Sequence, residues 1–433
     1  MMYEVLINEL YKRRTKGIKL GLERVFSVLE KFDNPQNLFK SIHIAGTNGK
    51  GSTSKIIYNL LRAHGLNTGL FTSPHLTRFT ERIIINDREI SEEEVLRLIK
   101  KIKPVGEELT FFEFITVMAF LYFVETGIEY AVLETGMGGR LDATNVVIPE
   151  LSVITTIGLD HQEFLGSDIK SIAKEKSGII KKGIPVVSSK QVLEAEEVII
   201  KKSEELGSEL FIYGKDFSAQ LKSMTLDGIT FTFHSSALSL KTSDLFLPLI
   251  GLHQLENVAV AMKAFMTIYP DWNVNCIIEG LKNVNMPGRL EVISKEPLVI
   301  FDIAHNPQAA QTLIKSLQTI TDKKPVLLFG IMRDKDVRGF IKSFENYASK
   351  VIFTVPSYER ALKYEELSKR VNGYSSLNLS YISKPSEAFK EGFTLCKKNP
   401  NLYLLCTGST YLIGELKEFL GEKTSHRRLG EVL

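Results

Sequence analysis

A glycine-rich loop between an apolar run and an amphipathic stretch is the feature that most constrains this chain. Residues 41–46 (SIHIAG) are typical of a short strand that breaks at glycine, and residues 50–64 carry apolar side chains at helical spacing. A loop between a strand and a helix presents backbone N–H groups and a helix N-terminus to an anion. We therefore predict a phosphate-binding loop over residues 45–52, with Lys50 as the cation for the terminal phosphates. The alternative is a turn that happens to contain a lysine.

The loop departs from the common G-x-x-x-x-G-K-[ST] pattern at one position. Gly51 follows Lys50, where a Ser or Thr hydroxyl normally holds Mg²⁺. A magnesium nucleotide therefore needs another hydroxyl. Ser52 is one candidate. Ser73 is another, because it follows the next apolar segment, residues 69–71, and can project from an adjacent strand end.

Strands and helices alternate along most of the chain, which is typical of a mostly parallel α/β sheet. We predict a P-loop-type, mostly parallel sheet in an N-terminal domain (1–290) and a smaller, Rossmann-like α/β C-terminal domain (291–433), with a hinge at residues 285–290. A Ser-, Thr- and Phe-rich stretch at 210–247 predicts a small β excursion. The expected strands are residues 41–46, 130–134, 151–157, 298–302, 325–330, 351–354 and 402–406, and the expected helices are 50–64, 92–101, 112–124 and 309–320.

The composition argues against several classes of protein. In 433 residues, 54 Lys and Arg oppose 51 Asp and Glu, so the net charge of +3 gives no electrostatic reason to expect nucleic-acid binding. Three scattered cysteines without CxxC spacing form no disulfide framework, which fits a reducing cytoplasm. Because no uncharged apolar stretch of ~18 residues and no signal-peptide pattern occurs, we expect neither a membrane span nor export.

Several polar side chains follow predicted strands and are candidates for the phosphate site. Glu134 ends an apolar strand, where a carboxylate suits Mg²⁺ directly or through water; the alternative is a solvated strand-end glutamate. His161 also follows a strand, although imidazole is an unusual ligand for Mg²⁺. Arg289, at the hinge, is placed to clamp a γ-phosphate when the domains close, or else to form an interdomain ion pair. Asp302 ends a strand of the second domain, within reach of ribose hydroxyls.

Two further positions carry both a functional and a structural interpretation. His253 and Asn257 stand four residues apart on one face of a predicted helix, and the amide of Asn257 offers the donor and the acceptor that adenine recognition requires. The alternative is an ordinary pair on a helix surface. Ser409 lies in a Thr-Gly-Ser turn after a strand, where a helix cap is the alternative to ligand binding.

A series of short motifs, spread over nearly the whole chain, resembles the folylpolyglutamate synthase and dihydrofolate synthase family, which is related to the Mur ligases. Several such motifs in family order are far more specific than any one of them. They are GTNGKGS (46–52), TSPHL (72–76), ETGMGGRLDATN (134–145), GLDH (158–161), EKSGIIK (175–181), HQLEN (253–257), PGR (287–289), DIAHNP (302–307) and CTGS (406–409).

The resemblance implies roles for individual residues. Ser73 and Glu134 would ligate one magnesium ion, so that Ser73 replaces the hydroxyl missing at Gly51, and His161 and Lys176 would ligate a second metal. Lys176 would be carbamylated by CO₂, because a protonated amine has no lone pair for a metal. The implied nucleotide contacts are Thr47, Asn48, Gly49, Lys50, Gly51, Ser52, Asn257, Arg289 and Asp302. The implied folate or pterin contacts are His75, Arg78, Phe112, Glu113, Asp142 and Ala143, and the implied glutamate contacts are His305 and Ser409. The implied catalytic residues are Lys50, Glu134, His161, Arg289 and His305.

The reaction that this resemblance implies is ATP-dependent addition of L-glutamate to the carboxylate of folate or dihydropteroate through an acyl phosphate. We expect a cytoplasmic monomer that uses ATP and two Mg²⁺ sites, and the residues do not separate the two acceptors. One alternative is a Mur-type cell-wall ligase, although about 45 residues before the phosphate loop are too few for the extra N-terminal domain of those enzymes. The other alternative is a nucleotide-binding regulator without ligase chemistry.

Overall fold

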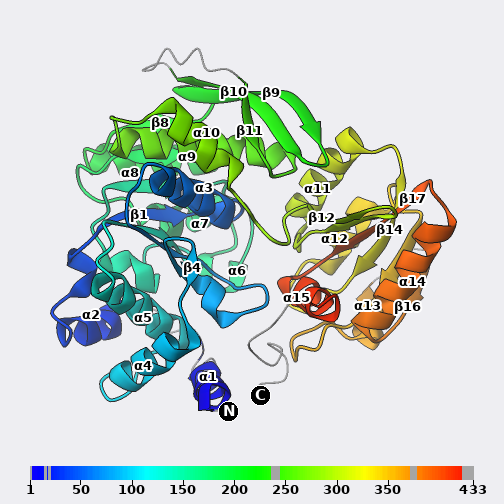
Figure 1. Ribbon diagram of the computed structural model, residues 1–433, viewed down its shortest axis with the longest axis horizontal. Coiled ribbons are helices and arrows are strands. Elements are labelled where there is room, and N and C mark those ends of the chain that lie inside the picture. Colours follow the sequence, from blue (N-terminus) through cyan, green and yellow to red (C-terminus); the bar gives the residue numbers. More distant parts are fainter. Residues whose placement is uncertain (1, 14–16, 18–20, 236–243, 371–377, 422–433) are drawn as a thin grey trace.

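Two α/β lobes lie side by side in the computed structural model, which describes residues 2–13, 17, 21–235, 244–370 and 378–421 (Figure 1). The larger lobe holds an eight-stranded and a three-stranded sheet, and the smaller lobe holds a six-stranded sheet. The predicted fold class is therefore confirmed: a large, mostly parallel sheet comes first and a smaller α/β unit follows. Among the described residues, no helix combines the length and the apolar character needed to cross a membrane.

The eight-stranded sheet has the order β4-β3-β2-β5-β1-β6-β7-β8 and is parallel except at the edge formed by β3 and β4. Neighbouring parallel strands bring their carboxyl ends to one edge of a sheet, so the ends of β2, β5, β1 and β6 meet there. The strands are β1 (Lys40–Ala45), β2 (Thr68–Phe71), β3 (Ile83–Ile85), β4 (Arg88–Glu89), β5 (Tyr130–Glu134), β6 (Leu151–Ile154), β7 (Val186–Ser188) and β8 (Leu210–Ile212).

Helices cover both faces of this sheet, which is why its central strands are apolar on both sides. In β5, Ala131 and Leu133 pack in one core cluster with α4 and α5, whereas Val132 packs in another with α3 and α9. The helices and 3₁₀ turns of this lobe are α1 (Met2–Lys12), α2 (Glu23–Glu30), η2 (Pro35–Asn37), α3 (Lys50–Ala63), η3 (Phe79–Arg82), α4 (Glu92–Ile102), α5 (Phe111–Glu125), η4 (Ala143–Val146), α6 (Gln162–Leu165), α7 (Ile169–Ser177), α8 (Leu193–Glu205), α9 (Leu252–Ile268) and α10 (Val274–Lys282).

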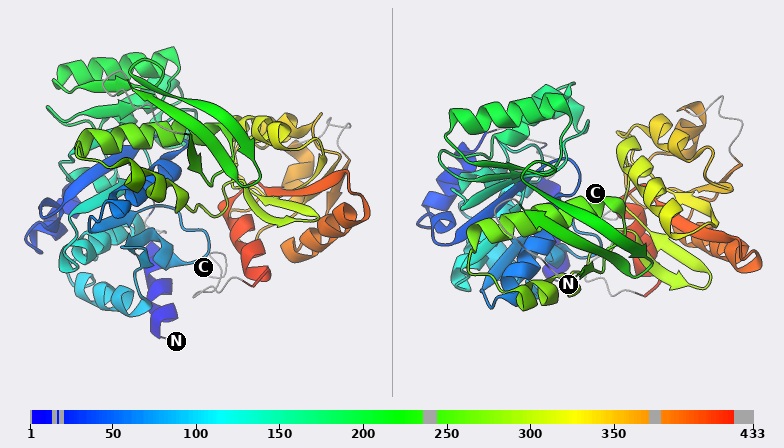
Figure 2. Two further views of the ribbon diagram at one scale, coloured as in Figure 1. Left: turned by 45° about the horizontal axis from the view of Figure 1, so that its top comes forward. Right: turned by 90° about the horizontal axis from the view of Figure 1, so that it is seen from above.

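The expected β excursion over 210–247 exists, but its first part belongs elsewhere. Residues 210–212 form β8 and join the large sheet, so only β9 (Phe217–Thr225), β10 (Gly228–Ser235) and β11 (Leu245–Leu247) make the separate antiparallel sheet. Residues 236–243 of the predicted stretch lie outside the described residues. Figure 2 shows the long β9–β10 hairpin reaching toward the smaller lobe.

The smaller lobe is built on a sheet of order β12-β13-β17-β14-β15-β16, parallel except for β12. Its four expected strands are present at its centre, and β12 and β16, which we did not predict, form its edges. The strands are β12 (Glu291–Lys295), β13 (Leu298–Phe301), β14 (Lys324–Phe329), β15 (Lys350–Phe353), β16 (Leu379–Tyr381) and β17 (Leu402–Thr407), and the helices are α11 (Pro307–Ile320), α12 (Val337–Phe344), α13 (Tyr364–Arg370), α14 (Pro385–Lys398) and α15 (Thr410–Phe419).

The segment that joins the lobes is bonded to the smaller one. Gly288 and Leu290 both have positive φ, and the N–H of Leu290 donates to Asp302 Oδ2 at 2.9 Å. Gly288 N–H donates to Glu291 Oε2 at 2.7 Å, and the other oxygen of Glu291 accepts from Lys417 Nζ at 2.7 Å. The expected domain boundary after residue 290 stays a prediction, but these bonds fix the hinge segment, and with it Arg289, to the smaller lobe.

Candidate active site

The phosphate loop runs from the end of β1 to the start of α3 and is bonded to the segment that follows β6. Thr47 and Asn48 donate their backbone N–H groups to Thr156 O at 2.9 and 3.2 Å, and Thr47 Oγ1 and Gly158 N–H are 3.0 Å apart. At Gly46 the two segments approach so closely that a Cβ would collide with Thr155. Because the N–H groups of Thr47 and Asn48 are used internally, the donors available to a phosphate are those of the first turn of α3.

Two lysines meet at one carbonyl oxygen of this loop. Lys50 Nζ lies 3.1 Å from Gly46 O, and Lys176 Nζ, which comes from α7, lies 2.6 Å from the same oxygen. Lys176 is 4% exposed, and its burial, together with the charge of Lys50, lowers its pKa to about 7. A substantial share of the Lys176 amine is therefore neutral near pH 7 and carries a lone pair.

Glu134, Ser73 and Gly51 lie together where three elements end or begin. Glu134 ends β5 and is 5% exposed, and its Oε2 accepts the backbone N–H of Ser73 at 3.1 Å. A Cβ on Gly51 would stand 3.5 Å from Glu134 Oε2, so the carboxylate lies over the start of α3. Burial raises the pKa of Glu134, while Lys50, the Ser73 N–H and Arg289 lower it. The structure thus brings Lys50, Ser73 and Glu134 to one place. The Ser73 hydroxyl and the Glu134 carboxylate supply oxygen atoms, which are the ligands that Mg²⁺ prefers.

The first turns of α9 pack against the same loop. The Asn257 amide oxygen touches Gly49, where any Cβ would collide with it, and Asn257 Nδ2 donates to Gln254 Oε1 at 3.0 Å. Gln254 Nε2 in turn lies 3.4 Å from Ser52 Oγ, so α9 contacts both ends of the glycine-rich turn. Burial lowers the pKa of His253 to about 4, so this neighbour is neutral at physiological pH.

The smaller lobe contributes a carboxylate, a guanidinium and an imidazole to the opposite wall. Asp302 accepts backbone N–H groups from Leu290 at 2.9 Å and Ala304 at 2.8 Å. Burial lowers the pKa of Arg289, and the nearby carboxylates of Asp302 and Glu134 oppose this shift, which places the guanidinium between the two lobes. His305 donates from Nδ1 to Ile303 O at 2.9 Å, and burial and Lys335 lower its pKa to about 4, so its Nε2 carries a lone pair.

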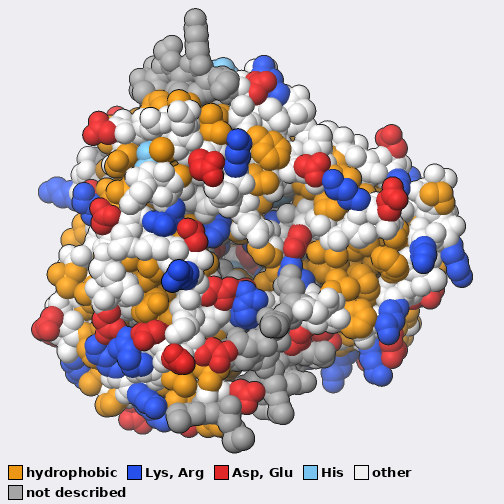
Figure 3. Space-filling model, viewed as in Figure 1, with side chains coloured by type: hydrophobic (Ala, Val, Ile, Leu, Met, Phe, Trp, Pro, Cys, Tyr) orange, Lys and Arg blue, Asp and Glu red, His pale blue; other side chains and the backbone are white. Residues whose placement is uncertain are grey.

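His161 lies at the junction of the lobes. It has φ +49°, its side chain is 43% exposed, and its Nε2 stands 3.7 Å from Asp160 Oδ2. Asp160 Oδ1 accepts from Lys335 Nζ of the smaller lobe at 2.9 Å. Figure 3 shows the surface hollowed between the two halves of the molecule, with charged side chains of both signs around the hollow. The part of the chain that the structure describes holds no cluster of three His, Cys, Asp or Glu side chains arranged to bind a metal.

Several residues expected to contact folate have clear structural partners. His75 is buried and accepts from Arg82 Nε at 2.7 Å, and Arg78 pairs with Glu89 at 2.6 Å. Glu113 completes the cap of α5 by accepting Thr110 N–H at 2.7 Å and also pairs with Arg24 at 2.7 Å. These bonds explain the fold around these side chains, and their predicted contacts with folate stay predictions.

The loop after β5 contains the remaining residues on this side. Phe112 packs its ring against Gly136, where a Cβ would lie 2.6 Å from it. Asp142 closes the loop by accepting from Met137 N–H at 2.9 Å and Thr144 Oγ1 at 2.6 Å, and Ala143 is buried next to it. The aromatic ring and the loop thus adjoin each other, as a site for a flat ring requires.

Ser409 caps a helix, which the sequence suggested as the alternative to ligand binding. Its hydroxyl accepts the N–H of Leu412 at 3.1 Å, which caps α15, and donates to Gly330 O at 2.7 Å. A contact between this buried hydroxyl and glutamate stays a prediction.

Two Mur ligase profiles cover most of the chain: the Mur ligase middle domain matches residues 44–265, and the Mur ligase glutamate ligase domain matches residues 288–410. The chain belongs to the folylpolyglutamate synthase and dihydrofolate synthase family of Mur-type ligases. The resemblance seen in the motifs is confirmed, and the chain is an ATP-dependent ligase.

Curated relatives and solved structures match this ligase over almost its full length. The folylpolyglutamate synthase of Lacticaseibacillus casei is 35% identical over 413 residues, which cover 92% of this chain and 94% of that protein. The dihydrofolate synthase/folylpolyglutamate synthase of Bacillus subtilis is 35% identical over 431 residues, which cover 93% and 96%. A Mycobacterium tuberculosis folylpolyglutamate synthase solved with ADP superposes with a TM-score of 0.90 at 28% identity and covers 98% of this chain and 99% of that one.

Three residues of this ligase that touch the site were not predicted from the sequence. Gln254 contacts Ser52, Gln308 of α11 accepts from Asn48 Nδ2 at 3.2 Å, and Lys335 pairs with Asp160. Gln254 lies inside the HQLEN motif, so the motif could have indicated that it lies at the site. Gln308 and Lys335 act across the two lobes, and no spacing in the sequence indicates such a contact.

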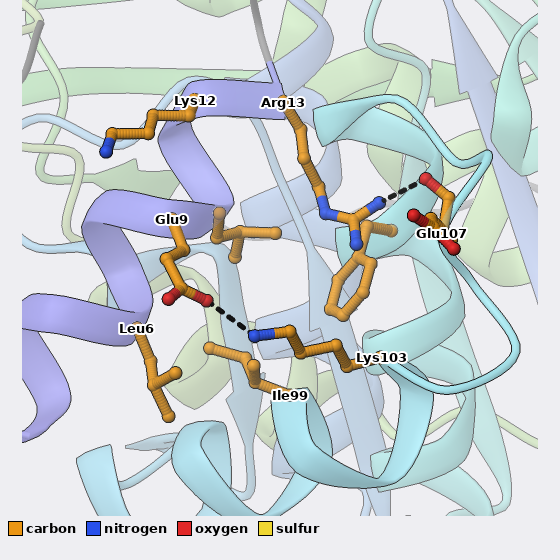
Figure 4. A pocket seen from close by; sticks show the side chains of 9 residues that line it. Leu6, Glu9, Lys12, Arg13, Ile99, Lys103 and Glu107 are labelled. Carbon is orange, nitrogen blue, oxygen red and sulfur yellow. Dashed lines mark hydrogen bonds and ion pairs between the residues drawn. The ribbon is translucent and has the colours of Figure 1, made fainter.

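A separate hollow of about 280 Å³ lies between α1 and α4, away from the strand ends (Figure 4). It is lined by apolar side chains such as Leu6 and Ile99 and is crossed by the ion pair of Lys103 with Glu9 at 2.7 Å. None of the predicted site residues lines it, so it is not part of the candidate active site.

The contact between Gly49 and Asn257 can be tested by adding one carbon. Gly49→Ala places a Cβ against Asn257 Oδ1 at φ +92°, so we expect the loop to shift and the affinity for ADP to fall by about tenfold or more. Gly65→Ala is the matched control, because Gly65 has φ +81° but no atom within 4 Å of its added Cβ. Titration calorimetry with ADP measures both variants, and equal losses of affinity would contradict this account.

Proposed function

We propose that this ligase joins L-glutamate to the carboxylate of a folate or a dihydropteroate through an acyl phosphate. The observation that carries the proposal is the convergence of Lys50, Ser73 and Glu134 at the carboxyl ends of adjacent strands, near Arg289 of the other lobe. A relative named folylpolyglutamate synthase and one named for both activities are each 35% identical to this chain, so which acceptor it prefers is the finer part of the proposal.

The first step moves the γ-phosphate of ATP to a carboxylate oxygen of the acceptor. Both groups are anionic, so their approach requires cations. Lys50 stands at the loop, and the partly buried Arg289 enters from the other lobe as a second cation for the phosphates. The P–O bond to ADP breaks as the bond to the acceptor oxygen forms.

The second step is attack of the glutamate amine on the acyl carbon, with phosphate as the leaving group. The amine must be unprotonated to attack and must then lose a proton. We propose that the Nε2 lone pair of neutral His305 accepts this proton. Because water would hydrolyse the acyl phosphate, closure of the two lobes around it is part of the proposed mechanism.

We also propose two Mg²⁺ sites beside the phosphates. Ser73 and Glu134 would hold the first, and His161 and a carbamylated Lys176 the second; bound Mg²⁺ would offset phosphate charge. The lowered pKa of Lys176 supports carbamylation, because only the neutral amine adds CO₂. The product is an anion beside Lys50, so the repulsion between two lysines becomes an attraction.

The cellular setting completes the proposal. We propose that the enzyme acts as a monomer in the cytoplasm, divides into domains near residue 290, and binds neither nucleic acid nor membrane. The near-balanced charge and the three free cysteines support this setting.

One assay tests the function. We expect ADP to be released with L-glutamate, ATP and Mg²⁺ in the presence of dihydropteroate, a reduced folate, or both, and the ratio of the two rates identifies the preferred acceptor. If no ADP is released with either acceptor in the presence of L-glutamate, the result would favour a nucleotide-binding regulator instead.

Glu134→Ala removes the proposed metal carboxylate without disturbing the packing of β5. We expect ligation to fall by about a hundredfold or more at an unchanged thermal midpoint, because phosphate charge would then be poorly offset. Glu150→Ala, which replaces an exposed glutamate immediately before β6, is the control. Full activity in Glu134→Ala would remove the metal assignment.

Carbamylation of Lys176 can be observed directly. Protein exposed to ¹³C-bicarbonate should show a carbamate carbon signal by NMR that disappears in Lys176→Arg. Lys181→Arg is the matched control, because Lys181 is also partly buried with a lowered pKa and bonds to Asn145 O at 3.2 Å. A carbamate signal that survives in Lys176→Arg, or is absent from the wild type, would refute the assignment.

A further inference from the structure

The phosphate loop and the segment after β6 behave as one structural unit. Thr47 joins them through its backbone N–H, which donates to Thr156 O, and through its hydroxyl, which bonds with both the N–H and the carbonyl of Gly158. Asn48 N–H adds a further bond to Thr156 O. A displacement of residues 156–160 would therefore also displace the turn that would hold phosphate.

Two side chains of the smaller lobe touch this unit. Gln308 lies in the first turn of α11, and its Oε1 accepts from Asn48 Nδ2 at 3.2 Å. Lys335 lies in the loop between β14 and α12, and its Nζ donates to Asp160 Oδ1 at 2.9 Å. Gln308 follows β13 and Lys335 follows β14, two parallel strands of the smaller sheet, so the carboxyl ends of these strands face the segments that follow strands of the larger sheet.

The end of the Gln308 side chain lies close to Gly158 of the larger lobe. A Cβ built on Gly158 would collide with Gln308 Oε1, so the amide of Gln308 would have to move to make room for it. Lys335 is half-buried, with 15% of its side chain exposed, and its partner Asp160 is 17% exposed. The ion pair is therefore partly screened from solvent and has a defined geometry.

We propose that Gln308 and Lys335 are positioning residues that dock the smaller lobe on the phosphate loop and so set the places of Arg289 and His305 against it. The inference rests on the proposed function, because it assigns those two residues to the reacting groups. Misplacement of reacting groups by about 1 Å costs on the order of a hundredfold in rate, so a contact that sets the distance between the lobes acts on catalysis without touching a substrate.

Other contacts hold the lobes together elsewhere, so removing the docking pair does not separate them. Met224 and Leu226 of the β9–β10 hairpin pack on the core of the smaller lobe, and Lys295 pairs with Asp227 at 2.9 Å. The N–H of Leu252 donates to Ser316 Oγ of α11 at 3.0 Å. Variants at Gln308 and Lys335 should therefore fold and bind nucleotide. Only the position of the smaller lobe relative to the phosphate loop should become less well defined.

The test combines kinetics with matched controls. We expect Gln308→Ala and Lys335→Met each to lower kcat about fivefold while the KM for ATP changes less than about twofold, since the loss falls on a step after binding. Gln311→Ala on the same helix and Lys342→Met on α12, both exposed, should leave both constants unchanged. Lys335→Arg, which keeps the charge, should recover part of the rate.

A second pair of variants tests the close contact itself. Gly158→Ala alone should lower kcat, because its Cβ pushes Gln308 away from Asn48. Adding Gln308→Ala to Gly158→Ala should cost nothing further, because the contact is already lost. Additive losses in this double variant would contradict the proposed contact.

The distance between the lobes supplies a readout that does not depend on activity. Spin labels at Lys201→Cys on α8 and Lys398→Cys on α14, in a Cys276→Ser background, report the separation in the presence of a non-hydrolysable ATP analogue. We expect one narrow distance distribution in the wild type and a broader one in Gln308→Ala and Lys335→Met. Unchanged distributions and unchanged kcat would overturn the proposal. If the wild type ligates neither acceptor, the proposed function fails, and the distance distributions still decide whether the two residues dock the lobes.

Discussion

The hydrogen bond from the Ser73 N–H to the Glu134 carboxylate joins two strand ends, and the proposed chemistry depends on it. It holds Ser73 against the carboxylate that lies over Gly51, where the usual hydroxyl of a phosphate loop is missing. The strand order β2-β5-β1 makes this possible, because the ends of β2 and β5 flank the start of α3. Lys50, Gly51 and Arg289, all predicted to contact the nucleotide, lie near this carboxylate.

The two lobes divide the work between them. The larger lobe holds the phosphate loop and the proposed metal ligands, and its close packing at Gly46 and Gly49 leaves the loop little freedom. The smaller lobe carries Arg289 and His305 on segments bonded to its own sheet. Chemistry therefore requires that the lobes meet in register, which is why contacts at their junction matter as much as the residues that touch a substrate.

The sequence predicted the parts that depend on local periodicity and on strand ends. The helix expected at 92–101 is observed as Glu92–Ile102, and Lys50, Ser73 and Glu134 converge because parallel strands end at one edge. The strand expected at 151–157 ends at Ile154, because the residues after it turn to hold the phosphate loop. Edge strands and contacts between lobes were missed, since Gln308 meets Asn48 across 260 residues of chain and no periodicity encodes such a pairing.

The most direct test of the central claim is a crystal structure with a non-hydrolysable ATP analogue and Mn²⁺, which replaces Mg²⁺ at oxygen ligands and scatters anomalously. The account predicts an anomalous peak bonded to Ser73 Oγ, a Glu134 carboxylate oxygen and the terminal phosphates, with Lys50 moved from Gly46 O onto those phosphates. A peak bonded to Ser52 instead, with Ser73 and Glu134 both free of metal, would contradict it.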